Sequence, residues 1–416
     1  LFVTEASALA IENIGSQNGI TTNNGDVTLL LTTGDLTVSQ VINAGDGSVS
    51  LTSATIEIDA EVTGNGGITL QPNAAGTTIG IGGGGGTFNL DDGEMDNLAS
   101  SGTVTIGRAA DGTGDVDIDA VDLSGESFSF TVVGGSVAVT GLDSGSNAVT
   151  LTARTTTITD GDSSTTTDVT GGTVTLSAVT GIGASGEDSS IDVDATVISA
   201  TNSTSGGIFL NAVGSGGVDI SSAQAQTAGD IEIIGSSEQV TLTDLNSFGS
   251  DITISLTSQN IVATDVVAGA AGNIVLTTTT SGDITLGTVT ADVDDIFVNS
   301  AGNITDVAGT VTADTLKLDS ATGVGVSNTP ITTDVVTLSA GASASGGVFV
   351  AESDALIIGT VDSLDGITTA NGDVTLTLTT GVLTVSEAID AGGVGAVSLT
   401  SATIEIDAEV TGNGGI

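Results

Sequence analysis

A stretch of 18 residues that occurs twice constrains this chain more than any other feature of its sequence. Residues 51–68, LTSATIEIDAEVTGNGGI, return letter for letter as residues 399–416. A longer likeness precedes it, because GITTNNGDVTLLLTTG at 19–34 returns as GITTANGDVTLTLTTG at 366–381. A single domain does not repeat its own opening so faithfully, whereas tandem arrays do.

The distance between the copies defines a long repeat. It is 347 residues at first and 348 after a one-residue insertion, where AGDGSVSL has become AGGVGAVSL. We therefore expect residues 1–347 to be one complete tandem unit and residues 348–416 to be the start of the next unit. The identity extends to acidic residues that core packing alone would not conserve between copies, so either recent duplication or a shared surface role explains it.

Between the copies, short segments follow one pattern. A glycine, often followed by Asp, Asn or Ser, precedes a run with an apolar residue at every second position, as in GDVTLLL at 25–31 and GNIVLTT at 272–278. Such a strand buries one face and exposes the other. In three segments the corresponding isoleucines are Ile231, Ile252 and Ile274, which lie 21 and 22 residues apart. One rung of this length cannot bury its apolar face alone, but stacked rungs can.

The period predicts an all-β, parallel β-helix or β-solenoid of roughly 20 rungs, on the order of 95 Å long at ~4.8 Å per rung. Val, Ile, Leu and Ala provide nearly all apolar residues, and the chain has no Trp or Tyr, which suits a narrow core. We expect Gly, Asn and Asp at rung corners to supply positive φ angles. An array of β-sandwich modules is the alternative, but such modules usually carry core aromatics and repeat near ~100 residues.

Residues 79–107 depart from the rung pattern. A run of five glycines precedes an acidic segment that predicts a short helical turn near 91–99, capped by Asp91 or Asp92. Three residues form its expected apolar side: Leu90, Met95 and Leu98.

This segment resembles repeat segments of large exported bacterial proteins of the filamentous-haemagglutinin-like group. The matching residues are Phe88, Leu90, Glu94, Met95, Asp96, Leu98, Thr103–Ile106 and Gly107. The pattern Gly-(Asp/Asn)-(Ile/Val)-Thr-Leu is similar to that group over most of the chain. The resemblance implies a right-handed parallel β-helix, a secreted or surface-anchored location, and a role in adhesion or as a structural fibre. The regularity of the 347-residue repeat favours a fibre over a receptor-binding adhesin.

Charge excludes several functions. The chain has three Lys and Arg residues in total and 51 Asp and Glu residues, which gives a formal net charge of −48. Nothing in the chain could neutralise nucleic-acid phosphates, and an anionic membrane surface would repel it. No apolar run reaches the ~18 residues of a membrane span, so we expect no membrane insertion. Without His, Cys or Tyr, nucleophilic and His–metal catalysis lack their residues. We expect no enzymatic activity and no required cofactor.

Acidic turns are the candidate sites. Carboxylates gathered in a turn offer the hard oxygen ligands that Ca²⁺ prefers. One group is Asp91, Asp92, Glu94 and Asp96; the second is Asp160 and Asp162, with Asp168 nearby. A solvated face or a helix cap is the plain alternative for each. Three further sets alternate with apolar residues and predict acidic outer faces of strands: Asp115, Asp117 and Asp119; Glu57, Asp59 and Glu61; Asp192 and Asp194.

Together these features predict a structural extracellular fibre, filament or surface-layer protein at the cell surface. We expect end-to-end and lateral self-association, with divalent cations or salt screening the acidic exterior. The stalk of a secreted adhesin is the first alternative. A polysaccharide-binding or -processing β-helix, with surface glycans as partners, is the second. Threonine ladders such as TLTLTT at 375–380 leave an ice-binding surface as a further alternative.

Overall fold

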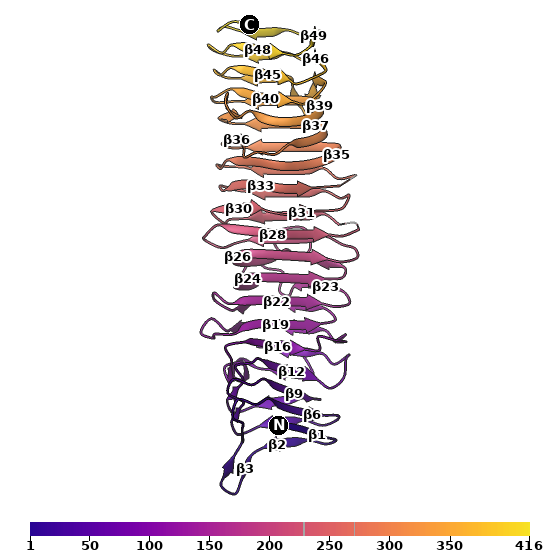
Figure 1. Ribbon diagram of the computed structural model, residues 1–416, viewed down its shortest axis with the longest axis vertical. Helices are drawn as coiled ribbons and strands as arrows, with labels where there is room; N and C mark the ends of the chain where they lie inside the picture. Colours follow the sequence, from indigo (N-terminus) through magenta and orange to yellow (C-terminus); the bar gives the residue numbers. More distant parts are fainter. Residues whose placement is uncertain (228, 270) are drawn as a thin grey trace. The chain divides into compact units, whose positions relative to one another are not determined.

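The computed structural model describes residues 1–227, 229–269 and 271–416, and Figure 1 shows its short strands stacked on one another. In these residues the chain forms an all-β, parallel β-solenoid of about 19 turns with one short helix. The predicted fold class is confirmed, while the right-handed sense stays a prediction. The chain divides into two compact units, Leu1–Ser205 with Phe209–Asn211 and Gly206–Ile208 with Ala212–Ile416.

In the first unit most strands pair in parallel with their counterparts in the next turn. The longest ladder consists of β1 (Phe2–Glu5), β6 (Val27–Leu31), β9 (Val49–Ser53), β12 (Ile68–Pro72), β16 (Thr103–Gly107), β19 (Ser129–Gly134), β22 (Ala148–Ala153), β24 (Val169–Ala178) and β26 (Ile191–Asn202). Val27, Val49 and Ile68 stand in register, and all three are buried. The alternating pattern thus places one aliphatic side chain above another in successive turns.

Shorter ladders complete the turns of this unit. The second face carries β2 (Leu9–Ile11), β7 (Leu36–Val38) and β10 (Ile56–Ile58), then β13 (Ile79–Ile81), β17 (Val116–Ile118), β20 (Val137–Val139), β23 (Thr157–Asp160) and β25 (Gly181–Ile182). The third carries β5 (Ile20–Thr21), β8 (Ile42–Asn43), β11 (Val62–Thr63) and β15 (Leu98–Ala99), then β18 (Val121–Asp122) and β21 (Leu142–Asp143), which pairs with the start of β24. A hairpin joins β3 (Asn13–Ile14) to β4 (Gln17–Asn18), and β14 (Phe88–Leu90) pairs with β13.

The second unit continues the same architecture. Its principal ladder contains β29 (Ile231–Gly235), β32 (Ile252–Leu256), β34 (Ile274–Thr278), β35 (Ile284–Ser300), β37 (Val311–Ser320) and β39 (Ile331–Ala342). Ile231, Ile252 and Ile274 are direct register partners, which confirms the predicted rung length. The other strands of this ladder system are β28 (Val218–Ala225), β30 (Gln239–Leu242), β31 (Leu245–Asn246), β33 (Asn260–Val267), β36 (Asn303–Asp306), β38 (Gly323–Val324) and β40 (Val348–Glu352). Strand β27 spans Ile208–Ala212.

Asp and Asn at the starts of strands form a hydrogen-bonded column along the second unit, which we call the Asx ladder. Its members, Asp230, Asp251, Asn273 and Asp295, each directly precede a core isoleucine. The Asn273 N–H donates to Asp251 Oδ1 at 2.8 Å, and the Asp295 N–H donates to Asn273 Oδ1 at 3.1 Å. The Asp251 N–H donates to Asp230 Oδ1 at 3.3 Å. The Asp or Asn that directly precedes the strand therefore accepts the N–H of the equivalent residue in the next turn.

The expected positive φ at rung corners is only partly correct. Asn24 and Gly282 do adopt it, with φ of 61° and 116°. Gly272, in GNIVLTT, does not, and its need for glycine has another cause. A Cβ added there would lie 2.0 Å from the Ser250 carbonyl oxygen of the preceding turn. Close approach of two backbones thus accounts for the glycine at this corner.

The departure at residues 79–107 is an insertion between two turns. Val104 pairs with Ile68, so 36 residues separate partners that elsewhere lie about one rung apart. The inserted residues include β14 and the helix α1 (Asp92–Met95), which is shorter than the predicted turn over 91–99. Leu90, Met95 and Leu98 are buried, as predicted.

The two copies of the repeated sequence fold in the same way. The second copy contains β41 (Leu356–Ile358), the hairpin β42 (Thr360–Val361) and β43 (Leu364–Asp365), β44 (Ile367–Thr369), β45 (Val374–Leu378), β46 (Val382–Val385), β47 (Ile389–Ala391), β48 (Val397–Thr400), β49 (Thr403–Ile406) and β50 (Val410–Gly412). Val27 pairs with Val49 in the first copy, and the equivalent Val374 pairs with Val397 in the second. The register is kept although one residue has been inserted between these strands.

The repeated stretch at 51–68 alternates as its pattern predicted. Ile56, Ile58 and Val62 are buried, whereas Glu57, Asp59 and Glu61 are exposed. Ala60 follows in the same alternation but is only half-buried, because it lies in the bend between β10 and β11.

Candidate functional site

The first predicted acidic group is a helix cap. Asp91 is the N-cap of α1 and its Oδ1 accepts the Glu94 N–H at 2.9 Å, while Glu94 Oε2 accepts the Asp91 N–H at 2.8 Å. The other Glu94 oxygen accepts the Ile58 N–H at 2.7 Å, which ties the helix to β10. Glu94 is buried, and this burial raises its pKa. The structure does not bring Asp92 or Asp96 into a group of three or more carboxylates within ligand distance, as far as the described residues go.

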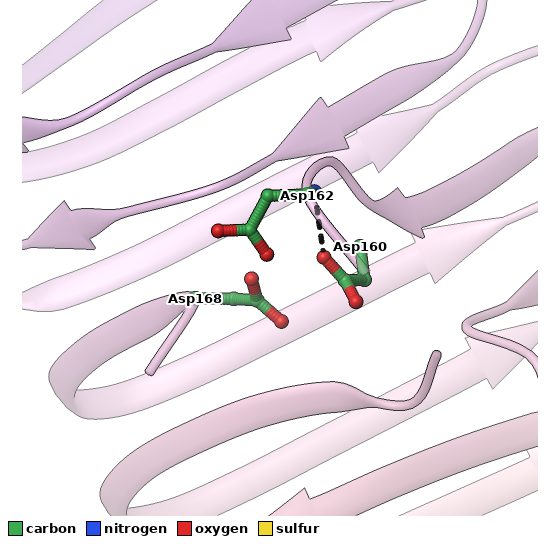
Figure 2. Close-up of side chains that lie close together, drawn as sticks. All are labelled: Asp160, Asp162 and Asp168. Atoms are coloured by element: carbon green, nitrogen blue, oxygen red, sulfur yellow. Dashed lines mark hydrogen bonds between the residues drawn. The ribbon is translucent and has the colours of Figure 1, made fainter. Parts of the chain in front are cut away.

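The second predicted acidic group does converge. Asp160 ends β23, Asp162 lies in the loop that follows, and Asp168 directly precedes β24. One carboxylate oxygen from each lies within 4.8 Å of the others. Figure 2 shows the three carboxylates facing a common space, and we call them the Asp160–Asp168 cluster.

Local hydrogen bonds shape this loop. Asp160 Oδ1 accepts the N–H groups of Asp162 and Ser163, each at 2.9 Å, which turns the chain directly after β23. Ser163 has a φ of 55°, a left-handed conformation that non-glycine residues rarely adopt. Asp162 Oδ1 accepts the Ser164 N–H at 3.1 Å. One oxygen of each of the two aspartates is thus committed to the turn, and the other is left for a ligand.

Asp168 is fully buried, and its two oxygens differ. Oδ2 accepts the Asp192 N–H from the next turn at 2.9 Å. Oδ1 is buried and has no hydrogen-bond partner in the described part of the chain, and the same holds for Asp160 Oδ2. A buried polar atom without a partner costs free energy, so native structures rarely contain one without a reason. Here two such atoms belong to a single cluster.

Asp192 is a fourth carboxylate beside the cluster. It was predicted to lie on a solvated strand face together with Asp194, and for Asp192 this is wrong because it is fully buried, whereas Asp194 is exposed. Three successive residues, Ile191 to Val193, are buried where β26 begins, so strict alternation does not hold there. Asp192 Oδ1 accepts the side-chain amide of Asn211, and no partner for Oδ2 occurs in the residues described.

Burial and mutual repulsion change the protonation of these groups. Burial, assisted by the charges of Asp160 and Asp192 and opposed by the hydrogen bond from the Asp192 N–H, raises the pKa of Asp168 to about 8. Burial likewise raises the pKa of Asp192 to about 6, assisted by the charge of Asp160 and opposed by the Asn211 hydrogen bond. Both effects follow from keeping carboxylates together away from water.

Within the described residues, no basic side chain forms an ion pair with the Asp160–Asp168 cluster. The chain has two Arg and one Lys. Arg108 forms an ion pair with Asp111 at 2.7 Å, and Lys317 pairs with Asp362 at 3.2 Å. Arg154 donates to the carbonyl oxygens of Ala109 and Ala110.

A second carboxylate group provides a contrast. Asp334, Glu352 and Asp354 also place oxygens within 4.8 Å of one another. The buried Glu352 accepts five hydrogen bonds: from Thr333 Oγ1, from the N–H groups of Val335, Ser353 and Asp354, and from Ser353 Oγ. Its oxygens are therefore satisfied by the protein itself. This group was not predicted, because its members are not gathered in one acidic turn of the sequence.

Comparison with protein-family models, curated proteins and solved structures found no match to this chain. The similarity to the filamentous-haemagglutinin-like group therefore rests on the motif residues alone. A helix long and apolar enough to cross a membrane does not occur among the described residues.

Proposed function

We propose that this protein is a non-enzymatic structural element of an extracellular filament or surface layer, built from tandem solenoid units. The observation that carries the proposal is the equivalence of the two repeat copies. Strands β6 and β9 pair in the same register as their counterparts β45 and β48, and β7 and β10 pair as β46 and β49 do. A repeat that returns to the same register lets one unit follow another without a change of fold.

The turn that follows the repeated stretch covers its apolar side chains in the first copy. In the first copy Ile56 and Ile58 are 5% and 1% exposed, and β14 lies against their strand. Their counterparts Ile404 and Ile406 are 39% and 55% exposed on β49, which pairs with β46 on one side. Ile404 and Ile406 lie in the last turn of this sequence, and in a tandem array the next turn would cover them as β14 covers Ile56 and Ile58. Burial of such an edge by a further turn is favourable, because apolar surface leaves water and backbone groups gain partners.

The mechanical role follows from the direction of the hydrogen bonds. Backbone ladders run from turn to turn, and the Asx ladder adds side-chain bonds in the same direction. Extension along the stack would have to break several of these bonds at once. The negative charge, −48 in total, keeps the exterior hydrated and makes lateral contacts depend on salt or divalent cations.

A chain with a second unit tests the proposal. In this longer chain, one additional complete unit, residues 1–347, is joined directly to the N-terminus of residues 1–416. The junction keeps the natural phase of the repeat. Electron microscopy is expected to show straight particles that are longer than those of the 416-residue chain by on the order of 80 Å, at ~4.8 Å per turn. The control lacks residues 338–347, about half a turn, so its units meet out of register and its particles should bend at the joint. If the longer chain with the natural phase instead appeared as two separate particles joined by a flexible link, the proposal would be overturned.

The alternative of an adhesin stalk shares the solenoid but places the function in a separate tip. The similarity to the filamentous-haemagglutinin-like group is also compatible with this adhesin-stalk hypothesis. Imaging of cell-surface material distinguishes the two, because a fibre gives uniform filaments and a stalk gives single rods with a distinct end. Binding of this chain to a glycan array would favour the polysaccharide-binding alternative.

A further inference from the structure

We propose that Asp160, Asp162 and Asp168 bind one divalent cation, with the ligand chemistry of Ca²⁺, in the loop between β23 and β24. This site goes beyond the fibre function and does not depend on it. Three carboxylates from a segment of nine residues, 160–168, meet within 4.8 Å, and Figure 2 shows them around a common space.

The unpartnered oxygens point to a ligand. Asp168 Oδ1 is buried without a partner in the described residues, and it belongs to a side chain that is 0% exposed and whose carboxylate meets those of Asp160 and Asp162. Asp160 Oδ2 is likewise buried without a partner in the residues that the structure describes. Both oxygen atoms lack a hydrogen-bond donor in the described residues. A bound cation can satisfy several such oxygens at once.

The same protein shows how a buried carboxylate is accommodated without a cation. Glu352 sits in an acidic group of the same size and accepts five hydrogen bonds from protein donors. Asp168 accepts one, from the Asp192 N–H. The difference between the two groups is therefore the supply of donors and not the number of carboxylates. Of the two groups found among the described residues, the Asp160–Asp168 cluster is the one with buried carboxylate oxygens that protein donors leave unsatisfied.

The donor set selects among cations. All three side chains offer carboxylate oxygen, without the nitrogen or sulfur ligands that zinc and other transition metals favour. Ca²⁺ accepts six to eight oxygens in a flexible arrangement, whereas Mg²⁺ demands near-ideal octahedral geometry and keeps several waters. An exposed loop aspartate such as Asp162 leaves space for waters to complete a Ca²⁺ shell. The backbone N–H of Asp192 holds the Asp168 carboxylate by donating to its Oδ2.

A bound cation would connect three parts of one corner. Asp160 belongs to the end of β23, Asp162 to the loop, and Asp168 to the start of β24, whose next neighbour in the stack is β26. The ion would therefore hold a loop of seven residues, 161–167, against the two strands that it connects. We expect its removal to loosen this corner before any other part of the first unit.

Calorimetric titration of CaCl₂ into the chelator-stripped 416-residue chain tests the proposal. Buffer with 0.5 M NaCl suppresses diffuse binding to the acidic surface. One saturable site is expected, with a Kd on the order of 10⁻⁵–10⁻³ M, the range from sensor to extracellular modules, and with weaker binding of MgCl₂. Asp168→Asn and Asp162→Asn are each expected to weaken it at least about tenfold. Asp168→Asn keeps an oxygen acceptor for the Asp192 N–H, and Asp162→Asn alters an exposed residue, so both should fold.

Asp354→Asn is the matched control, since it removes one exposed carboxylate from the other acidic group and should leave the Kd unchanged. Hydrogen exchange of residues 161–167 should slow on Ca²⁺ addition in the unaltered chain and in Asp354→Asn, but not in Asp168→Asn. Absence of a saturable site in 0.5 M NaCl would overturn the proposal. Equal Ca²⁺ binding by Asp162→Asn, Asp168→Asn and the control would also overturn it, because the binding would then be diffuse.

Discussion

The Asx ladder makes a prediction that separates hydrogen bonding from charge. Asp251→Ala removes the oxygen that accepts the Asn273 N–H at 2.8 Å, while the Asp251 N–H keeps its own bond to Asp230. Asp251→Asn retains an acceptor oxygen and removes only the charge. If the ladder stabilises the stack through its acceptors, the alanine variant loses stability and the asparagine variant does not.

The magnitude follows from the environment of this bond. A hydrogen bond to a charged group contributes about 1.5–3 kcal/mol when protected, and a neutral one about 0.5–1.5 kcal/mol. Asp251 is exposed, so water competes for the Asn273 amide and the lower range applies. We expect Asp251→Ala to cost about 1 kcal/mol locally. Asp251→Asn should stay within about 0.5 kcal/mol, because repulsion from the exposed Asp230 is screened by salt.

Amide hydrogen exchange is the suitable assay, because repeat stacks unfold in parts and a global midpoint would dilute a local effect. A loss of about 1 kcal/mol corresponds to roughly fivefold faster exchange of the Asn273 amide, at RT of about 0.6 kcal/mol. Unchanged exchange in Asp251→Ala would show that water replaces the acceptor at no cost. Equal acceleration in Asp251→Asn would show that the charge, and not the acceptor, is what stabilises the turn.

Three further outcomes follow from the packing and the charges. Ile274→Ala, at a buried position in register with Ile252, should lower the free energy of unfolding by about 2–5 kcal/mol in urea titrations followed by circular dichroism. Gly272→Ala should cost at least about 2 kcal/mol, because its Cβ meets a carbonyl oxygen at 2.0 Å, whereas Gly125→Ala enters open space and should be neutral. With cations chelated, stability should fall as pH rises from about 4 to 8, since the folded pKa of Asp168 is about 8 against an ordinary 3.8 and the folded state binds the extra proton. The loss is up to about 5 kcal/mol, and Asp168→Asn should flatten this part of the profile; a profile of unchanged slope would contradict the buried ionisation.

Much of the fold could be predicted because its information is local. Alternation in GDIEIIG or GNIVLTT specifies a strand with one buried face, and the 21- and 22-residue spacing of Ile231, Ile252 and Ile274 specifies which residues stack. Each rung meets only its neighbours, so a pattern repeated along the sequence is also a pattern in space.

What could not be predicted depends on corners and distant partners. Asp192 follows the alternating pattern of an outward residue, yet the bend at the start of β26 buries it together with Ile191 and Val193. Glu94 was expected in a cap or a cation site, but its bond to the Ile58 N–H joins residues 36 apart across an insertion. The convergence of Asp160, Asp162 and Asp168 was anticipated from their spacing, whereas the burial of Asp168 had no local signal.

The kept register of the two repeat copies has a consequence for the gene. Because Val374 meets Val397 as Val27 meets Val49, a crossover between misaligned copies would join turns that already fit each other. Gain or loss of whole units would leave the strand pairing between the remaining units intact and would change only the length of the protein. The one-residue difference between the copies lies in the corner before β9 and β48, where it leaves the pairing undisturbed. Corners can therefore accept small insertions as long as the strands keep their pairing. The number of units can then change without harm to the fold.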